Sequence, residues 1–278
     1  MRQTGTIHQL LRLACTGAIG LLFTTFAGAQ EERSRQAPEL DALLQGSGLS
    51  GSLLVYSAAE DRYYSNDFEH ARRGQLPAST FKIPHSLIAL ELGIAKGATT
   101  LFVWDGAPRA MKQWEQDLTF TQAFHRSCVP CYQEIARKVG LDRMREYLGR
   151  LDYGQMDVRA DNLDQFWLRG NSRISPMEQI RFLRRLYAGD LALRPETLAV
   201  FRALMVIEEG QGYRLSGKTG WSVDRGVDNG WFVGYLEKEG AVYFFASNLA
   251  PLPGTSDAVF LEARKSLTLE ALRVLGML

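Results

Sequence analysis

A β-hairpin late in the chain constrains the fold more than any other feature. Residues 231–236 form a near-continuous apolar run, residues 239–240 (Glu-Gly) give a turn, and residues 241–249 run back as a second apolar segment. Two such runs around a glycine-containing turn are typical of a hairpin in an antiparallel sheet. Because a sheet must bury at least one face, we expect helices to cover this one.

Strand-like segments also lie near the start of the chain, at residues 51–57 and 62–65, whereas residues 95–210 are mostly helix and loop. The helices that we expect there and at the two ends of the folded part cover residues 38–45, 118–126, 132–139, 142–148, 176–188, 196–208 and 260–275. We predict an α+β fold, an α/β sandwich with a central antiparallel sheet plus an inserted all-helical domain. The catalytic unit would span residues 30–278, with a sheet subdomain at about 30–78 and 211–278 and a helical subdomain at about 95–210.

The first 29 residues have the pattern of a secretory signal peptide. The first twelve residues include Arg2 and Arg12 and no acidic residue. Residues 13–26 are apolar, and Ala27-Gly28-Ala29 is an A-x-A-like cleavage site. The apolar run is too short to span a bilayer. We therefore expect cleavage between Ala29 and Gln30, export to the periplasm, and no membrane attachment afterwards.

The charge balance argues against polyanionic partners. The 278 residues carry 32 Lys+Arg and 31 Asp+Glu, so no strong field of either sign exists and nucleic acid is not an expected partner. The four histidines are scattered without the spacing of metal ligands, so no catalytic metal is expected.

Ser79 and Lys82 form an S-x-x-K pair ahead of an apolar run at residues 83–92, which Gly93 ends. The pattern predicts a helix with Ser79 at its N-terminus, and residues three apart share a helix face. The Lys82 amine would then lie beside the Ser79 hydroxyl and take its proton, as in an activated nucleophile. The tetrapeptide alone is a weak signal, because it occurs often by chance.

Two further motifs make that signal specific. Ser127-Cys128-Val129 lies between two helical segments, and Lys218-Thr219-Gly220 lies in an extended stretch before the hairpin. Together with S-x-x-K, a second serine and a late K-T-G are typical of the serine enzymes that recognise penicillin.

With these motifs the chain resembles the class D serine β-lactamases, the oxacillinase family, over most of its length after residue 29. One departure is Tyr153-Gly154-Gln155, where the family usually shows Y-G-N. The resemblance implies a penicillin-binding-protein/β-lactamase-like fold and hydrolysis of β-lactam antibiotics, which confers resistance. The matching segments are P-A-S-T-F-K at 77–82, S-C-V at 127–129, F-W-L at 166–168, R-I-S-P-M-E-Q at 173–179, K-T-G-W at 218–221 and G-W-F-V-G-Y at 230–235.

The resemblance makes Ser79 the nucleophile of an acyl-enzyme and Lys82 its general base. An ordinary lysine is protonated at neutral pH, but an apolar pocket lowers its pKa and leaves an amine that reacts with carbon dioxide. The resemblance implies this N-carboxylation of Lys82 and no other cofactor. Val129, Trp167 and Leu168 would build the pocket, with the Trp167 indole N–H as a donor to the carbamate.

The resemblance also assigns the remaining site residues. Ser127 and Lys218 would relay a proton to the lactam nitrogen, and the backbone N–H groups of Ser79 and Trp221 would form the oxyanion hole. The expected substrate-binding residues are Thr219, Gly220, Tyr153 and Arg264. Gly220 would leave room for the substrate, and Arg264 would bind its carboxylate. Arg225, in an expected loop at residues 222–229, is the rival for that carboxylate.

Several alternatives stay open. A penicillin-binding DD-peptidase or transpeptidase and a non-hydrolysing β-lactam sensor share the three motifs. The C-x-P-C pattern of Cys128 and Cys131 resembles a thiol–disulfide oxidoreductase site, but no βαβ unit precedes it, so two buried thiols or a tight local disulfide are better readings. The chain could be a monomer or a homodimer, because the edge of an antiparallel sheet permits but does not require pairing.

Overall fold

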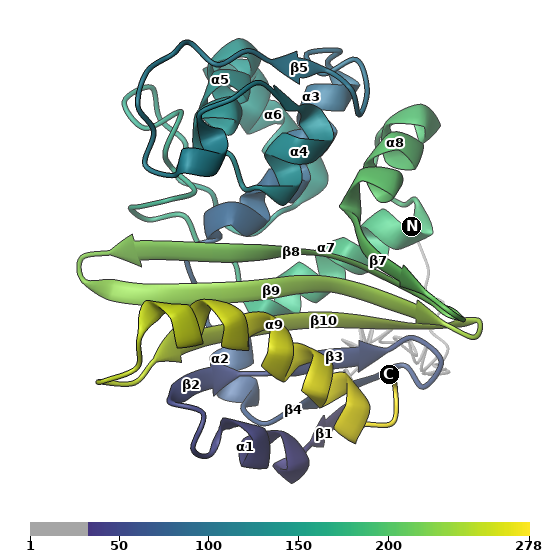
Figure 1. Ribbon diagram of the computed structural model, residues 1–278. Helices are drawn as coiled ribbons and strands as arrows, with labels where there is room; N and C mark the ends of the chain where they lie inside the picture. Colours follow the sequence, from purple (N-terminus) through teal and green to yellow (C-terminus); the bar gives the residue numbers. More distant parts are fainter. Residues whose placement is uncertain (1–32) are drawn as a thin grey trace, which may run out of the picture. The chain divides into compact units, whose positions relative to one another are not determined.

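An eight-stranded sheet is the centre of the fold in the computed structural model, which describes residues 33–278 (Figure 1). All neighbouring strands are antiparallel except β1, which pairs with β4 in parallel. The predicted signal peptide lies outside the described residues. The strand order is β1 (Ser34–Gln36), β4 (Arg62–Ser65), β3 (Leu54–Ser57), β10 (Ala241–Pro251), β9 (Val227–Lys238), β8 (Tyr213–Asp224) and β7 (Val206–Gly210), with β2 (Leu49–Ser52) also paired to β10.

The β8–β9 hairpin is longer than the sequence suggests. The expected loop at residues 222–229 is wrong, because β8 and β9 stay paired as far as Asp224 and Val227. Only Arg225 and Gly226 turn the chain, with φ of 53° and 76°. Two central residues of positive φ are the mark of a two-residue hairpin turn that matches the twist of its strands. Arginine is uncommon at positive φ, so Arg225 gives no sequence signal for this turn.

The N-terminal strands also differ from expectation. The single strand predicted at residues 51–57 is split, because the side chain of Asn66 accepts a hydrogen bond from the Leu53 N–H at 2.8 Å between β2 and β3. Between β4 and Leu76 lies the short helix α2 (Phe68–Arg72), which the sequence did not predict and which Asp67 caps by accepting from the His70 N–H at 2.8 Å.

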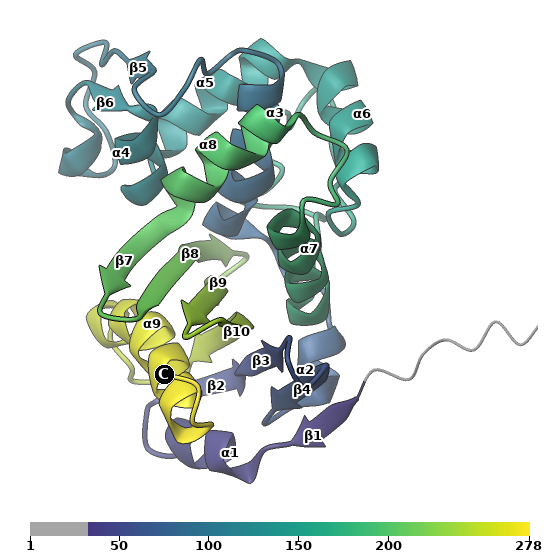
Figure 2. The ribbon, with the colours of Figure 1, turned by 90° about the vertical axis from the view of Figure 1, so that its right-hand side faces the viewer.

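Helices cover both faces of the sheet (Figure 2). α9 (Asp257–Val274) and α1 (Pro38–Leu44) pack together on one face, and α7 (Pro176–Ala188) packs against β10, β9 and β3 on the other. α9 lies close to the sheet because residue 230 is a glycine. A Cβ at Gly230 would lie 2.5 Å from the Phe260 ring and 2.7 Å from the Arg264 side chain. This close approach brings Arg264 to the neighbouring strand.

The inserted helices lie beside the edge of the sheet that β7 and β8 form (Figure 1). The helix predicted at residues 176–188 is α7; it begins with a capping box in which Ser175 and Glu178 are bonded reciprocally, and it lies on the sheet and not among the inserted helices. The helix predicted at residues 196–208 ends at Met205, where β7 begins. The inserted helices are α3 (Lys82–Glu91), α4 (Phe120–His125), α5 (Val129–Val139), α6 (Leu141–Leu151) and α8 (Pro195–Met205), beside a small sheet of β5 (Leu101–Phe102) and β6 (Leu118–Thr119). Among residues 33–278 no helix is both long and apolar enough to cross a membrane.

Candidate active site

Ser79 lies in a single 3₁₀ turn, η1 (Ala78–Phe81), that runs directly into α3. Ser79 therefore precedes the α-helix by three residues, and Lys82 is the first residue of α3. The Lys82 amine and the Ser79 hydroxyl are hydrogen-bonded at 3.0 Å between Nζ and Oγ. The proximity predicted from S-x-x-K is thus present, although a 3₁₀ turn provides it.

Three hydrogen bonds from distant segments hold the chain just before Ser79. Trp231 Nε1 and Asn229 Nδ2, both on β9, each donate to the Leu76 carbonyl at 2.8 Å. The Ala78 N–H donates to the Trp167 carbonyl at 2.8 Å. The sequence analysis missed Asn229, although a polar amide at the start of a buried apolar strand is a usable signal.

Lys82 is fully buried, and its surroundings favour the neutral amine. Burial lowers the pKa of Lys82 well below its ordinary value, and the positive charge of Lys218 lowers it further. Burial also lowers the pKa of His85 to about 3, with Lys82 as the second cause, so His85 is not a cation at neutral pH.

The buried Trp167 indole, which packs against His85 and Phe81, lacks an acceptor among the described residues. Trp167 is 0% exposed, and within residues 33–278 its Nε1 has no hydrogen-bond partner. Its ring lies 4.8 Å from that of His85 and 5.7 Å from that of Phe81 between centroids. Buried N–H groups are nearly always paired, so this donor, like the unpartnered ring nitrogens of His85, would suit an acceptor that the described protein atoms do not supply.

Ser127 and Lys218 form the second hydrogen-bonded pair of the site. Lys218 Nζ donates to Ser127 Oγ and, at 2.9 Å, to the Thr219 carbonyl. Burial, followed by the charge of Arg264, lowers the pKa of Lys218 to about 7. Ser127 has a φ of 52° in the turn between α4 and α5. Lys218 can therefore both give and take a proton near neutral pH.

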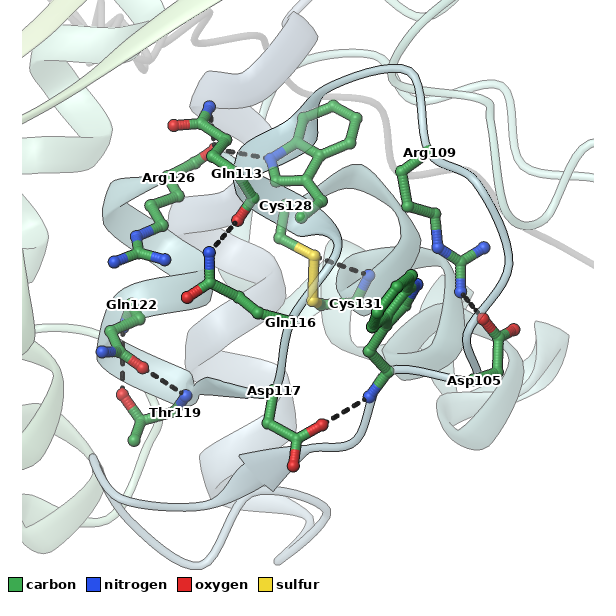
Figure 3. The surroundings of a disulfide bond; sticks show 12 residues. Asp105, Arg109, Gln113, Gln116, Asp117, Thr119, Gln122, Arg126, Cys128 and Cys131 are labelled. Atoms are coloured by element: carbon green, nitrogen blue, oxygen red, sulfur yellow. Dashed lines mark hydrogen bonds and ion pairs between the residues drawn. A yellow bond between two sulfur atoms is a disulfide. The ribbon is translucent and has the colours of Figure 1, made fainter.

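Cys128 and Cys131 are joined by a disulfide directly after Ser127 (Figure 3). The Cys131 N–H donates to Cys128 Sγ at 3.2 Å, so Cys128 also caps the N-terminus of α5. Of the two readings favoured by the sequence, the structure has the local disulfide. The bond closes a short ring that contains Val129, a residue of the pocket wall.

One edge of β8 borders the pocket. β7 pairs with β8 only over residues 213–216, and η1 packs against β8. Thr219, Gly220 and Trp221 line the pocket. A Cβ at Gly220 would lie 3.1 Å from the Trp231 Cβ and 3.2 Å from Thr80 Cγ2, so this glycine allows β8 to pack against η1. The room for a substrate expected from Gly220 stays a prediction beside this packing role.

The pocket has a volume of about 580 Å³ and brings together most of the predicted residues. Arg264 is one of them: it is 8% exposed, and it donates to the Gly220 carbonyl and, at 3.1 Å, to the Leu261 carbonyl. Burial lowers its pKa to about 10, so it stays cationic at neutral pH. Arg225 is exposed in the β8–β9 turn and does not line the pocket. The lining residues are Ser79, Ala110, Met111, Gln113, Trp114, His125, Arg126, Ser127, Val129, Leu168, Thr219, Gly220, Trp221, Leu261 and Arg264.

Tyr153 does not lie in the pocket. Its side chain is 1% exposed, and its hydroxyl lies 3.1 Å from Gln179 Oε1, to which it donates, and 3.3 Å from Thr80 Oγ1. Because Thr80 belongs to η1, Tyr153 stabilises the turn that contains Ser79, and it does so from the protein core. Gln155 pairs through its backbone with Arg173 at 2.8 and 2.7 Å. The loop contact therefore does not require the shorter asparagine side chain.

Comparisons with known proteins agree with this geometry. The family model of the penicillin binding protein transpeptidase domain matches residues 52–258. The β-lactamase OXA-10 of Pseudomonas aeruginosa is 39% identical over 229 residues, which cover 81% of this chain and 84% of that protein. The β-lactamase OXA-48 of Klebsiella pneumoniae is 40% identical over 223 residues, covering 80% and 82%. A solved class D β-lactamase, YbXI from Nostoc, matches with a TM-score of 0.81 and 38% identity over 86% of this chain and 99% of that one.

Proposed function

Because the chain belongs to the class D serine β-lactamases, we propose that it hydrolyses β-lactams through an acyl-enzyme on Ser79, with N-carboxylated Lys82 as the general base. The observation that carries the proposal is the pair of Ser79 Oγ and a fully buried Lys82 Nζ, 3.0 Å apart. Burial disfavours the charged form of such a lysine. As a neutral amine it is both a base and a nucleophile towards carbon dioxide.

The surroundings of Lys82 fit the modification. A carbamate carries acceptor oxygens, and the unpaired Trp167 N–H is a buried donor on a ring that packs against His85, whose pKa the charge of Lys82 lowers. Carried on Lys82, the carboxylate would supply the base that takes the Ser79 proton for acylation and later a proton from water for deacylation. Val129 and Leu168 are apolar residues of the pocket that Ser79 also lines, where they would limit the access of bulk water to Lys82.

The chain's own groups account for the remaining steps of acylation. Ser79 Oγ attacks the lactam carbonyl and the C–N bond breaks, while the backbone N–H groups of Ser79 and Trp221 stabilise the oxyanion. Lys218, with its pKa of about 7, passes a proton through Ser127 to the leaving nitrogen. Arg264 binds the substrate carboxylate, for which a cation in a pocket without acidic lining is well suited.

Stopped-flow kinetics with a chromogenic cephalosporin tests the hydrolase. We expect steady turnover, whereas one stoichiometric burst without turnover would favour a β-lactam sensor or a transpeptidase. Bicarbonate provides the second test. Low pH protonates Lys82 and reverses carboxylation, so activity lost there should return on adding bicarbonate. If it does not return, Lys82 acts without the carboxylate.

The proposed site of action is the periplasm, after cleavage between Ala29 and Gln30. The support is the pattern of residues 1–29, and N-terminal sequencing of the protein secreted by a Gram-negative host tests it. A monomer and a homodimer both remain compatible with this activity, and light scattering distinguishes them.

A further inference from the structure

We propose that Arg126 is a specificity-determining residue that binds a second negative group of the substrate. The enzyme would then favour β-lactams that carry another carboxylate in addition to the one on the ring system. This inference rests on the proposed hydrolysis of β-lactams, because it concerns the same pocket. Arg126 belongs to none of the sequence motifs, and its position emerges only from the structure.

The pocket is strongly biased towards anions. Arg126, Arg264 and His125 all line it, and Lys218 is hydrogen-bonded to Ser127, another lining residue. Among the described residues that line the pocket there is no aspartate or glutamate. One monoanionic substrate therefore leaves at least one arginine without a counter-charge.

The two arginines differ in how their guanidinium groups are used. Arg264 already donates to the carbonyls of Gly220 and Leu261 and is held in one place. The guanidinium of Arg126 makes no hydrogen bond or ion pair with any residue from 33 to 278, and Figure 3 shows it without a partner. In the same view Arg109 is paired with Asp105 at 2.6 Å.

The backbone of Arg126 is nevertheless fixed. Its N–H donates to the Gln122 carbonyl at 2.8 Å at the end of α4. Its carbonyl accepts from Trp114 Nε1 at 2.9 Å and from Gln113 Nε2 at 3.3 Å. The next residue is Ser127, which Lys218 holds. Arg126 is thus a free cation on an anchored segment, beside the proton relay and on a different wall from Arg264, which comes from α9.

The expected effect follows from the partial burial of Arg126. A charge-assisted pair in a half-buried pocket is stronger than an exposed ion pair but weaker than a fully buried one. Removing the guanidinium should therefore lower kcat/KM for a dianionic β-lactam about 5- to 30-fold. The value for its monoanionic counterpart should change less than about twofold, because Arg264 still holds the ring carboxylate.

The experiment compares matched substrates on matched variants. One pair is a penicillin with a carboxylate on its side chain and the same penicillin without it; the other is a cephalosporin pair that differs by a carboxylate on the ring substituent. Arg126→Gln, Arg126→Lys and the control Arg225→Gln, an exposed arginine outside the pocket, are measured with all four. We expect Arg126→Gln to lose the dianion preference in at least one pair, Arg126→Lys to keep part of it, and Arg225→Gln to keep all of it.

A dianion preference that is equal in the wild type and in Arg126→Gln for both pairs overturns the assignment of Arg126. If the wild type turns over none of the four substrates, the proposed hydrolase fails instead, so the two failures are distinguishable. The wild type gives an independent measure that does not depend on the folding of a variant. Raising the ionic strength should narrow its dianion preference, because added salt screens a partly exposed pair. A preference that is insensitive to salt also counts against Arg126.

Discussion

Replacing Trp167 by phenylalanine removes one of two buried donor groups that have no partner among residues 33–278 in this region, the other being the ring N–H of His85. The substitution keeps an aromatic ring in a fully buried position between Phe81 and His85. It deletes the indole N–H and part of the ring volume. If the carboxylated Lys82 accepts a hydrogen bond from this N–H, the substitution selectively weakens carboxylation.

The magnitude follows from the burial of the pair. A hydrogen bond to a charged group contributes about 1.5–3 kcal/mol, and about 1.4 kcal/mol is a factor of ten in an equilibrium constant. The bicarbonate concentration that half-restores activity should therefore rise about 10- to 150-fold in Trp167→Phe. The smaller ring also costs some stability, which a thermal melt measures separately.

The assay is a titration of steady-state activity against bicarbonate, with enzyme first stripped of carbon dioxide at low pH. Trp104→Phe is the matched control, because its indole bonds to the Ala107 carbonyl outside the pocket. We expect Trp167→Phe to approach wild-type activity only at high bicarbonate. A folded Trp167→Phe enzyme with the same half-saturating bicarbonate as the wild type would refute the reasoning.

Three further predictions follow from the other groups of the site. Lys218 has a pKa of about 7 in the folded protein and about 10.4 when unfolded, so the unfolded chain binds more protons between these values and stability rises with pH across that window. In chemical denaturation, Lys218→Met should show a shallower rise of the unfolding free energy from pH 7 to 10, and an unchanged slope counts against a neutral Lys218. Arg264→Gln should raise KM about 5- to 30-fold with a smaller effect on kcat, because a charge-assisted bond to the substrate carboxylate is lost; initial-rate kinetics would contradict this if KM were unchanged. Removing the disulfide with Cys128→Ala and Cys131→Ala should lower the unfolding free energy by about 2 kcal/mol, as loop entropy predicts for so short a ring, and reductant should destabilise the wild type but not this double variant.

The sequence predicted the parts of the site that depend on short spacings. Ser79 and Lys82 lie within one turn and a half of helix, so their contact follows from local geometry. The hairpin of β9 and β10 was readable because both strands are buried and apolar and a glycine turn separates them. These features need no knowledge of what packs against them.

The parts that were missed depend on partners far along the chain. Arg126 looks like any surface arginine in the sequence, and only the fold of α4 against the pocket gives it a role. The packing of Gly220 against Thr80 and Trp231 was not expected, and its role in making room for substrate stays a prediction. Tyr153 was expected at the substrate, but its hydroxyl supports η1 from the core. Each of these outcomes was decided by tertiary packing, which single-sequence patterns do not encode.

The bonds to the Leu76 carbonyl also determine how freely the nucleophile can move. Its two donors, on Asn229 and Trp231, lie 153 and 155 positions away in the sequence. The turn before Ser79 therefore cannot open by local fraying; it opens only when the central strand β9 gives way. Segments tied in this way exchange their amide hydrogens only through openings that approach the cost of global unfolding. Ser79, the proposed nucleophile, therefore follows a backbone segment that opens only together with the sheet, and we expect a substrate to bind to a turn that is already formed.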